Sequence, residues 1–331
     1  MFTKTKVAAL GAVAAIALTA CASDDSGEES TTGTSGGTET ATGDFPEGST
    51  MAALAEAGKI TIGTKFDQPL FGLVGPDGVP VGFDVEIGKM IAAELGIDEG
   101  NITWTETVSA NREPYIEGGQ VDIVVATYTI NDERKEIVSF AGPYYNAGQA
   151  LMVLSDNEDI AGPDDLAGKV VCSVEGSTPA ANIAENYPDA ELKLFGAYTD
   201  CLEPLRNGQV DVVTTDNVIL AGYVDESDGD FKIAGDPFTE EPYGIGLAHD
   251  DDEFRNWIND VLEASFDDGR WMEAWNATAG TVLPEPEPPT VDRYENRRSV
   301  SPWCVPALER RDAPFTGRGP WAHSSTTTTW C

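Results

Sequence analysis

Hydroxyl, amide and basic side chains gather directly after a hydrophobic segment near the middle of the chain. Residues 121–126 predict a buried strand, and Thr127, Thr129 and Arg134 follow it. The polar pair at 131–132 supplies a cap for a helix whose first turn contains Arg134. Hydroxyl groups, helix N-terminal amides and a guanidinium group together bind a carboxylate, and ligands of α/β sheets lie at the carboxyl ends of strands. The segment therefore predicts an anion site.

Strands and amphipathic helices alternate on both sides of this segment. Such alternation predicts mostly parallel sheets flanked by helices, so the loops that follow the strands face one side together. Asp84 is predicted to cap a helix that ends at Leu95 and carries its apolar residues on one face. The sequence at 208–213 echoes the sequence at 119–124. This internal echo predicts two lobes of like construction.

The N-terminus has the features of an exported lipoprotein. Lys4 and Lys6 precede an apolar run at 7–20, and the Leu-Thr-Ala sequence at 18–20 leads directly to Cys21. The pattern resembles a lipobox, which implies that Cys21 carries a lipid anchor. A transmembrane helix is the alternative, but the run is shorter than the roughly 20 apolar residues that a bilayer core requires. We therefore expect a protein anchored to the outer face of the cell membrane.

Acidic residues dominate the chain, which has a formal net charge of -37 at pH 7. Nucleic acid is excluded as an expected partner, because phosphate binding requires a basic surface. A signal peptide is expected at 1–20. Residues 22–44, which follow Cys21, consist almost entirely of Ser, Thr, Gly, Asp and Glu. Such a composition has almost nothing to bury and predicts a disordered tether over 21–45.

The chain contains 5 cysteines and 2 histidines. Outside the cytoplasm a pair of cysteines can form a disulfide, and Cys172 with Cys201 would bridge a strand and the start of a helix within one lobe. Buried free thiols are the alternative. Because the sequence has no Cys-x-x-Cys motif and few histidines, we expect no metal site, and no cofactor is expected either.

The chain divides into two lobes joined by two extended hinge strands, followed by a tail. We expect the first lobe to comprise residues 46–145 and 241–283, and the second lobe to comprise residues 146–240. Proline-rich sequence begins after Leu283 and predicts a disordered tail over 284–331. A role in partner binding is the alternative for this tail.

Six motifs occur in an order that resembles one protein family. They are 63–69, 81–86, 119–122, 129–134 with 140–145, 175–178 and 243–247. The chain is similar to the polar-amino-acid solute-binding proteins of ABC importers, and most of all to the glutamate-binding lipoproteins of Gram-positive uptake systems. The resemblance implies a two-lobed, periplasmic-binding-protein-like α/β fold of type II. Such a protein closes on one free amino acid and delivers it to a membrane permease, and we expect it to act as a monomer.

The resemblance also implies roles for individual residues. Arg134 matches the arginine that binds the α-carboxylate, and Thr129, Ser177 and Thr178 match the groups beside that carboxylate. Asp216 matches the acceptor of the α-ammonium group. Two further residues match positions that line the site: Phe66 and Thr127.

The charge of the ligand side chain decides which further groups are needed. Glutamate at neutral pH needs a second cation, whereas glutamine does not. Ser109 and Arg112 resemble a motif in which the arginine meets a side-chain carboxylate, and Lys65 is a further available cation. We therefore expect glutamate or aspartate as the ligand. The alternative for each basic residue is an ion pair: Arg134 with Glu133 or Glu136, Arg112 with Glu113 or Glu106, and Lys65 with Asp67.

One residue departs from the family pattern, and other functions share the fold. Glu175 stands where many relatives have a basic or polar residue, and it would repel an acidic ligand unless it points away. Glutamine or asparagine is therefore the alternative ligand. Cyclohexadienyl and arogenate dehydratases resemble the same fold, but no Ser/His/Asp or Cys/His set is present here, so we expect no enzyme activity. A ligand sensor on the same fold is a further alternative.

Overall fold

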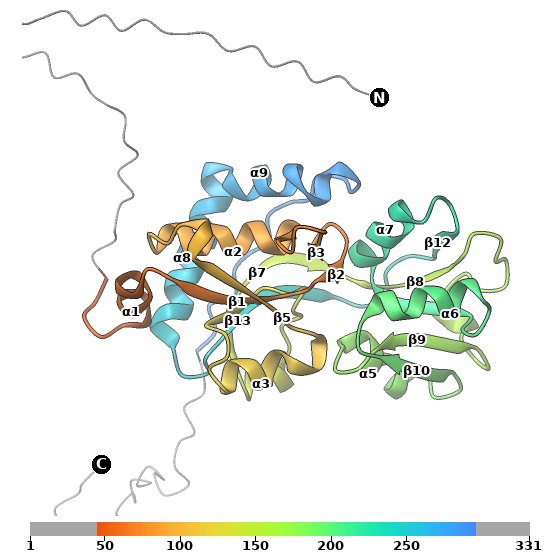
Figure 1. Ribbon diagram of the computed structural model, residues 1–331. Coiled ribbons are helices and arrows are strands. Elements are labelled where there is room, and N and C mark those ends of the chain that lie inside the picture. The colour runs from red at the N-terminus through yellow and green to blue at the C-terminus, as the bar shows by residue number, and fades with distance from the viewer. Residues whose placement is uncertain (1–44, 296–331) are drawn as a thin grey trace, which may run out of the picture. The chain divides into compact units, whose positions relative to one another are not determined.

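The computed structural model describes residues 45–295. The predicted signal peptide, Cys21, the tether up to residue 44 and the tail beyond residue 295 lie outside the described residues. Two five-stranded sheets with flanking helices form the α/β fold that the sequence predicts (Figure 1). Within residues 45–295, no helix has both the length and the hydrophobicity that crossing a bilayer requires.

The first sheet combines parallel and antiparallel strands. Strand β1 is parallel to β5 and β6, whereas β13 is antiparallel to β6 and β7. The strands, in their order across the sheet, are β5 (Ile102–Glu106), β1 (Ile60–Thr64), β6 (Ile123–Val124), β13 (Glu241–Leu247) and β7 (Ser139–Ala147). The strand predicted over 121–126 is thus paired over two residues only. A separate three-stranded sheet is formed by β2 (Asp67–Gln68), β3 (Gly72–Val74) and β4 (Pro80–Val81).

The second sheet repeats this plan. Strand β9 is parallel to β10 and β11, and β8 is antiparallel to β11 and β12. The strands, in their order across the sheet, are β10 (Glu191–Phe195), β9 (Val170–Val174), β11 (Val212–Asp216), β8 (Gln149–Leu154) and β12 (Phe231–Ala234). The chain passes from the first sheet to the second between β7 and β8 and returns between β12 and β13, and each of these four strands is antiparallel to its neighbours.

Helices cover both faces of the first sheet, with α2 and α9 on one face and α3 on the other (Figure 1). We call this sheet, the three-stranded sheet and their helices the first lobe. Its helices are α1 (Thr50–Ala57), α2 (Phe83–Glu94), α3 (Arg112–Glu117), α4 (Asp132–Lys135), α8 (Asp252–Asp268) and α9 (Arg270–Ala277). The second sheet and its helices form the second lobe, with α5 (Thr178–Asn186), α6 (Leu202–Arg206) and α7 (Asn217–Glu226). Short 3-10 helices occupy Glu99–Asn101, Ser109–Asn111, Pro163–Asp165, Tyr198–Cys201 and Ala279–Thr281.

Local sequence signals account for the long helix α8. The Asp251 side chain accepts a hydrogen bond from the Phe254 N–H at 3.0 Å and caps the helix, and Gly269 ends it with a left-handed φ of 90°. The apolar residues Ile258 and Leu262 recur at helical spacing and are wholly buried. Burial of each such side chain contributes roughly 1.5–3 kcal/mol.

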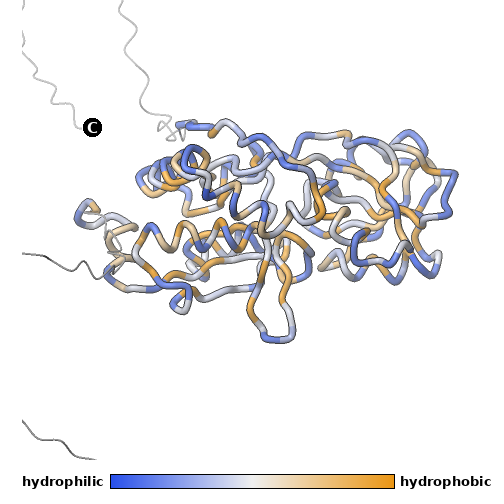
Figure 2. The backbone as a smooth tube through the Cα atoms, turned by 90° about the horizontal axis from the view of Figure 1, so that it is seen from above, coloured by the Kyte–Doolittle hydropathy of each residue, from blue (hydrophilic) through white to orange (hydrophobic). Residues whose placement is uncertain are grey.

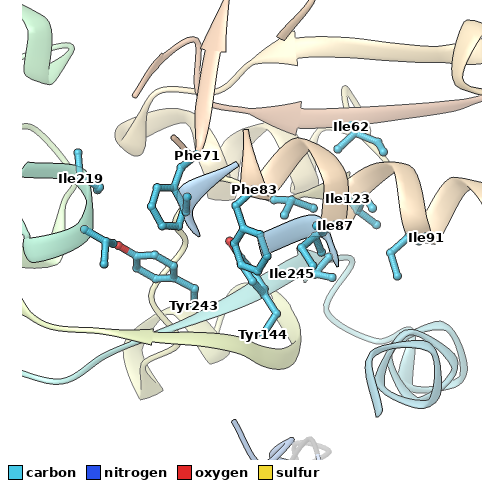
Figure 3. Packing of buried hydrophobic residues seen from close by; sticks show 14 of the residues in the cluster. Ile62, Phe71, Phe83, Ile87, Ile91, Ile123, Tyr144, Ile219, Tyr243 and Ile245 are labelled. Carbon is cyan, nitrogen blue, oxygen red and sulfur yellow. The ribbon is translucent and has the colours of Figure 1, made fainter. Parts of the chain in front are cut away.

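Aromatic side chains fill the centre of the first lobe. Phe83 packs edge-on against Phe71 and against Trp271. Figure 3 shows Phe83 and Tyr144 together beside α2, and Tyr243 extending from β13 toward the side on which Ile219 lies. Hydrophobic stretches run mainly through the interior, and the turns at the periphery are mostly hydrophilic (Figure 2).

The chain passes between the sheets twice, at neighbouring positions. Gly148 separates β7 from β8, and the segment that includes Thr239 leads from β12 to β13. A Cβ atom on Gly148 would lie 2.6 Å from the Thr239 carbonyl oxygen, so only glycine allows the two passages to approach this closely. Gln149 N–H donates to the Thr239 hydroxyl at 3.0 Å.

Helix α2 differs from the prediction at its start. It begins at Phe83, its N-cap is Gly82, and Asp84 does not cap it. The Asp84 carboxylate is wholly buried and accepts hydrogen bonds from Thr127 N–H and Tyr144 Oη, both at 2.7 Å. The prediction that Asp84 caps this helix was wrong, because partners distant in sequence bind the carboxylate.

The packed part of the chain extends past the Leu283 boundary that the sequence predicts. Val291 joins the hydrophobic core and is 9% exposed. The Tyr294 ring lies between Lys135 Nζ, 4.2 Å from its centroid, and Arg255 Cζ, 4.3 Å from it. Phe140 N–H donates to the Tyr294 hydroxyl at 2.7 Å. Residues 284–295 therefore contact the first lobe.

Candidate functional site

Residues from both lobes line a small, mostly polar cleft. Seven of the predicted site residues line the cleft: Ser109, Arg112, Thr127, Thr129, Ser177, Thr178 and Asp216. Five further lining residues were not predicted: Gln68, Pro179, Tyr198, Thr215 and Ile219.

Three predicted residues do not belong to the lining. Lys65 is buried behind it, and its Nζ atom donates to the Ser109 hydroxyl at 2.9 Å. Arg134 lies beside the lining residue Thr129, to whose carbonyl it donates. Phe66 is half-buried and lies outside the lining.

Helix α4 fixes the position of Arg134. The Asn131 side chain caps this helix by accepting from the Arg134 N–H at 2.8 Å. The Arg134 guanidinium donates from Nη1 to the Thr129 carbonyl at 2.8 Å and from Nη2 to the Gly176 carbonyl at 3.0 Å. Its Nε atom lies 3.1 Å from a carboxylate oxygen of Glu113. Arg134 thus joins the two lobes and pairs with a glutamate of α3.

Helix α5 begins at the cleft. The Ser177 hydroxyl accepts from the Ala180 N–H at 3.1 Å and caps the helix. Thr178 is the first residue of the helix, so its amide N–H has no intrahelical partner. The Thr178 hydroxyl lies 3.3 Å from that of Thr129 and donates to a carboxylate oxygen of Glu241 at 2.7 Å.

Asp216, at the end of β11, presents a carboxylate to the cleft. Its Oδ2 atom accepts from the Tyr243 hydroxyl at 2.6 Å, whereas Oδ1 is buried and has no hydrogen-bond partner among the described residues. Burial, followed by the nearby Glu241 carboxylate, raises the pKa of Asp216 to about 7. The neighbouring Thr215 hydroxyl is likewise buried without a partner in residues 45–295. A cationic ligand group would satisfy both oxygens.

Arg112 is held by backbone carbonyl groups. Its Nε atom donates to the Ser109 carbonyl, and Nη1 donates to the carbonyls of Ala126 and Thr127, each at 3.3 Å. The guanidinium carbon lies 4.3 Å from the centroid of the Tyr128 ring. Burial and the nearby Arg134 charge lower the pKa of Arg112 to about 10, so this residue is still a cation at neutral pH.

The Lys65 ammonium group lies among other cations. Burial, followed by the Arg112 charge, lowers the pKa of Lys65 to about 7. In the same region the wholly buried carboxyl group of Asp84 has its pKa raised to about 7 by burial. An anionic ligand next to Lys65 and Arg112 would offset the unfavourable proximity of their charges.

Glu175, the residue that departs from the family pattern, is exposed and is absent from the cleft lining.

Cys172 and Cys201 form the expected disulfide, with their Cα atoms 5.9 Å apart. Cys201 ends the short helix that begins at the lining residue Tyr198, so the disulfide connects this wall of the cleft to β9.

Contacts between the lobes also occur beside the cleft. The Asp67 carboxylate accepts from the Tyr198 N–H at 3.0 Å, and the Asp67 carbonyl accepts from the Tyr223 hydroxyl at 2.8 Å. A Cβ atom on Gly222 of α7 would lie 2.9 Å from the Pro69 carbonyl oxygen. The segment that contains β2 therefore fits closely against the second lobe.

The cleft chemistry is that of charged and hydrogen-bonding groups. Within residues 45–295, no three His, Cys, Asp or Glu side chains form a group suited to a metal ion.

Gln68 is the lining residue that sequence reasoning could have found, because it lies inside the first motif of the family resemblance. It was missed because that motif was interpreted through its charged and aromatic members only.

Comparisons with known proteins agree with this geometry. The sequence profile of the bacterial extracellular solute-binding proteins, family 3, matches residues 60–277. The chain is 42% identical over 245 residues to the glutamate-binding protein GluB of Corynebacterium efficiens, covering 71% of this chain and 83% of that protein. It is 39% identical over 228 residues to the glutamine-binding protein GlnH of Bacillus subtilis, covering 68% and 83%.

Solved structures show the same type of fold. An ancestral arginine-binding protein bound to glutamine superposes with a TM-score of 0.63 at 33% sequence identity, covering 67% of this chain and 97% of that protein. The expected fold, a two-lobed periplasmic-binding-protein-like fold of type II, is therefore confirmed. Since the family profile spans more than half of the chain, this protein belongs to the bacterial extracellular solute-binding proteins, family 3.

Proposed function

We propose that this protein is the extracytoplasmic substrate-binding lipoprotein of an ABC-type amino-acid importer and that it binds glutamate or aspartate between its two lobes. The observation that carries the proposal is the arrangement of charge in the cleft. A buried, unpartnered oxygen of Asp216 lies in one wall, and the cation Arg112 lies in the same lining. The names of the relatives, which include glutamate-binding and glutamine-binding proteins, support this assignment.

Each charge of the ligand has a matching group. The α-ammonium group would donate to Asp216 Oδ1, and the α-carboxylate would accept from the Thr178 amide beside Arg134 and Thr129. The side-chain carboxylate would lie near Arg112, with Lys65 behind the lining as an additional positive charge. A carboxylate removed from water without such cations would cost several kcal/mol.

The cellular setting of the proposal rests on the N-terminal sequence. The apolar run that ends at Cys21 favours export and lipid attachment, and the polar tether would give the binding lobes reach from the membrane. In this setting the closed protein delivers its amino acid to a membrane permease and works as a monomer.

A thermal-shift screen of the twenty amino acids, followed by calorimetry, tests the proposal. We expect glutamate or aspartate to give the largest shift and to bind with a Kd of about 1 μM or tighter. Arg134→Ala should abolish the binding of every amino acid, because it removes the connection between the lobes as well as the positive charge. Arg112→Ala should weaken glutamate more than glutamine, because glutamine has no side-chain charge to neutralise.

Lys59→Ala is the matched control, since it removes one positive charge from an exposed position of the first lobe. It should leave every affinity unchanged. Equal losses of glutamate and glutamine affinity in Arg112→Ala would remove the side-chain role from Arg112. A screen without any shift would contradict the proposed function as a whole.

Glutamine is the second candidate ligand, and one observation favours it. The pKa of Lys65 is lowered to about 7, so this residue is only partly charged at neutral pH, and the cleft then has fewer full positive charges for a second carboxylate.

A dehydratase would instead need a carboxylate free to transfer a proton. In the proposed complex Asp216 is engaged with the ammonium group, so we do not assign an enzyme activity. A sensor would share the site and differ in lacking amino-acid uptake.

A further inference from the structure

Gln68 is a buried residue of the cleft whose amide group has one unsatisfied end. It belongs to β2 in the first lobe, and its side chain is 0% exposed. The Oε1 atom lies 2.9 Å from the Thr127 hydroxyl, from which it accepts a hydrogen bond that is shared with the Ala126 carbonyl at 2.8 Å. The Nε2 atom is buried and has no partner among the described residues. Buried amide N–H groups are normally paired, so this donor requires a partner that enters the cleft.

The position of this amide is set by a chain of contacts behind the cleft. Thr127 has a left-handed φ of 44°, a conformation that a β-branched residue adopts only when its surroundings impose it. The Asp84 carboxylate supplies that constraint by accepting from the Thr127 N–H at 2.7 Å. The second oxygen of Asp84 is engaged by the Tyr144 hydroxyl at 2.7 Å. Asp84 thus positions Thr127, and Thr127 positions Gln68.

Arg112 also contacts Thr127. Its Nη1 atom donates to the Thr127 carbonyl at 3.3 Å, and its Nη2 atom makes no hydrogen bond to the described residues. Both Gln68 and Arg112 therefore contact Thr127, and each has a donor left for a ligand. A carboxylate has two oxygens that can accept from two such donors, whereas a primary amide has only one acceptor oxygen.

We propose that Gln68 is a specificity-determining residue whose Nε2 donates to the side-chain carboxylate of an acidic amino acid, alongside Arg112. This inference rests on the proposed function, because it presupposes an amino acid in the cleft. If the amide were turned over, Nε2 would face Thr127 and Oε1 would face the cleft, and the site would then favour a side-chain amide. The relative affinities for glutamate and glutamine therefore distinguish the two orientations of the amide.

Gln68→Glu tests the inference, because it keeps the size of the side chain, removes both donors and adds a negative charge. We expect the glutamate affinity to fall by about 10- to 100-fold, the range for a lost hydrogen bond to a charged group. The glutamine affinity should change less, because its amide can donate to the new carboxylate. Gln68→Ala, which adds no charge, should also reduce glutamate affinity more than glutamine affinity.

The control is Gln120→Glu, which makes the same chemical change at an exposed position of the first lobe. It should leave both affinities unchanged in calorimetry. If the wild-type protein binds glutamate, both Gln68 variants should lose more affinity for glutamate than for glutamine. Equal losses for the two ligands would overturn the role of Gln68 and would leave the proposed function standing. A wild-type protein that binds no acidic amino acid would instead overturn the proposed function and this inference together.

Discussion

Buried ionisable groups lie in the cleft and directly behind it. Asp216 and Asp84 are carboxylates buried almost completely, and Lys65 is a buried amine. Each has its pKa moved toward neutrality mainly by burial, which disfavours the charged form. Groups in this state are expected where a ligand supplies the missing charge. The ligand-free protein should therefore respond to pH near neutrality.

The stability of the ligand-free protein is expected to depend on the titration of Asp216. Its pKa is raised from 3.8 to about 7 in the folded protein, so the folded state retains a proton that the unfolded state has already lost. This contribution to the free energy of unfolding is fully present below about pH 4 and is lost as the pH rises through about 7. Asp216→Asn removes the titration.

Urea unfolding of the wild type and of Asp216→Asn at several pH values measures this effect. The free energy of unfolding of the wild type, relative to that of the variant, should decrease by about 2–4 kcal/mol between pH 4 and pH 7.5. A difference that does not change with pH would contradict the raised pKa.

Residue types and their spacing predicted many of the cleft residues but few of their partners. Thr127 and Thr129 could be placed because they follow a recognisable strand, and Asp216 could be placed through the family resemblance. The partners could not be placed, because they come from elsewhere in the chain. Asp84, for example, looked like a helix cap, yet its carboxylate binds the amide of a residue 43 positions away. Only the packing of α2 against the first sheet brings the two together.

At the scale of elements, short segments outside the regular sheets hold the cleft in place. Helix α4 has 4 residues and yet orients Arg134, because Asn131 caps it and the guanidinium is engaged on three sides. The disulfide does the same for the short helix at Tyr198–Cys201. A bridge across 29 residues stabilises a fold by roughly 3 kcal/mol, largely through the unfolded state.

The C-terminal segment at 284–295 is another such element. Its Tyr294 ring packs against Lys135, the residue next to Arg134, and the Asp292 N–H donates to the Gly142 carbonyl at 2.7 Å. The sequence could not predict this packing, because a few apolar residues without periodicity in proline-rich sequence indicate disorder. The contacts depend on a surface that the folded first lobe provides.

Truncation after Leu283 is therefore expected to destabilise the protein. It removes the buried Val291 side chain and the hydrogen bond to the Tyr294 hydroxyl. Together these contribute about 2–4 kcal/mol, which should lower the melting temperature by about 5–10 °C in calorimetry. A chain that ends after Glu295 retains these contacts and is the control. An unchanged melting temperature after truncation at Leu283 would show that the segment is dispensable.

At the scale of the whole described fold, the two lobes approach each other closely beside the cleft. The sequence could predict two lobes from the echo between 119–124 and 208–213, together with the family resemblance. It could not predict the facing surfaces, because these are assembled from separate loops. Gly176 lies so near Ala110 that a Cβ atom would come within 2.7 Å of the Ala110 Cα, and Gly222 approaches Pro69 in the same way.

Gly222→Ala is expected to hinder closure without touching the ligand. The new methyl group would lie 2.9 Å from the Pro69 carbonyl oxygen, so the lobes would have to remain farther apart. The affinity for every bound amino acid should fall by a similar factor, about 10-fold, in calorimetry. The melting temperature of the ligand-free protein should not decrease, because alanine favours helix α7.

The control is Gly100→Ala, where a Cβ atom would meet nothing within 4 Å. Its affinities should equal those of the wild type. A loss in Gly222→Ala that affected glutamate but not glutamine would point to a change inside the cleft and would contradict an effect on closure.

The contacts of Asp67 with Tyr198 and Tyr223 join the lobes through atoms that need no ligand between them. These contacts are the same whichever amino acid is bound, so they contribute equally to the retention of each one. Asp67 would thus set how long the lobes stay together, whereas the cleft residues would set which amino acid they hold.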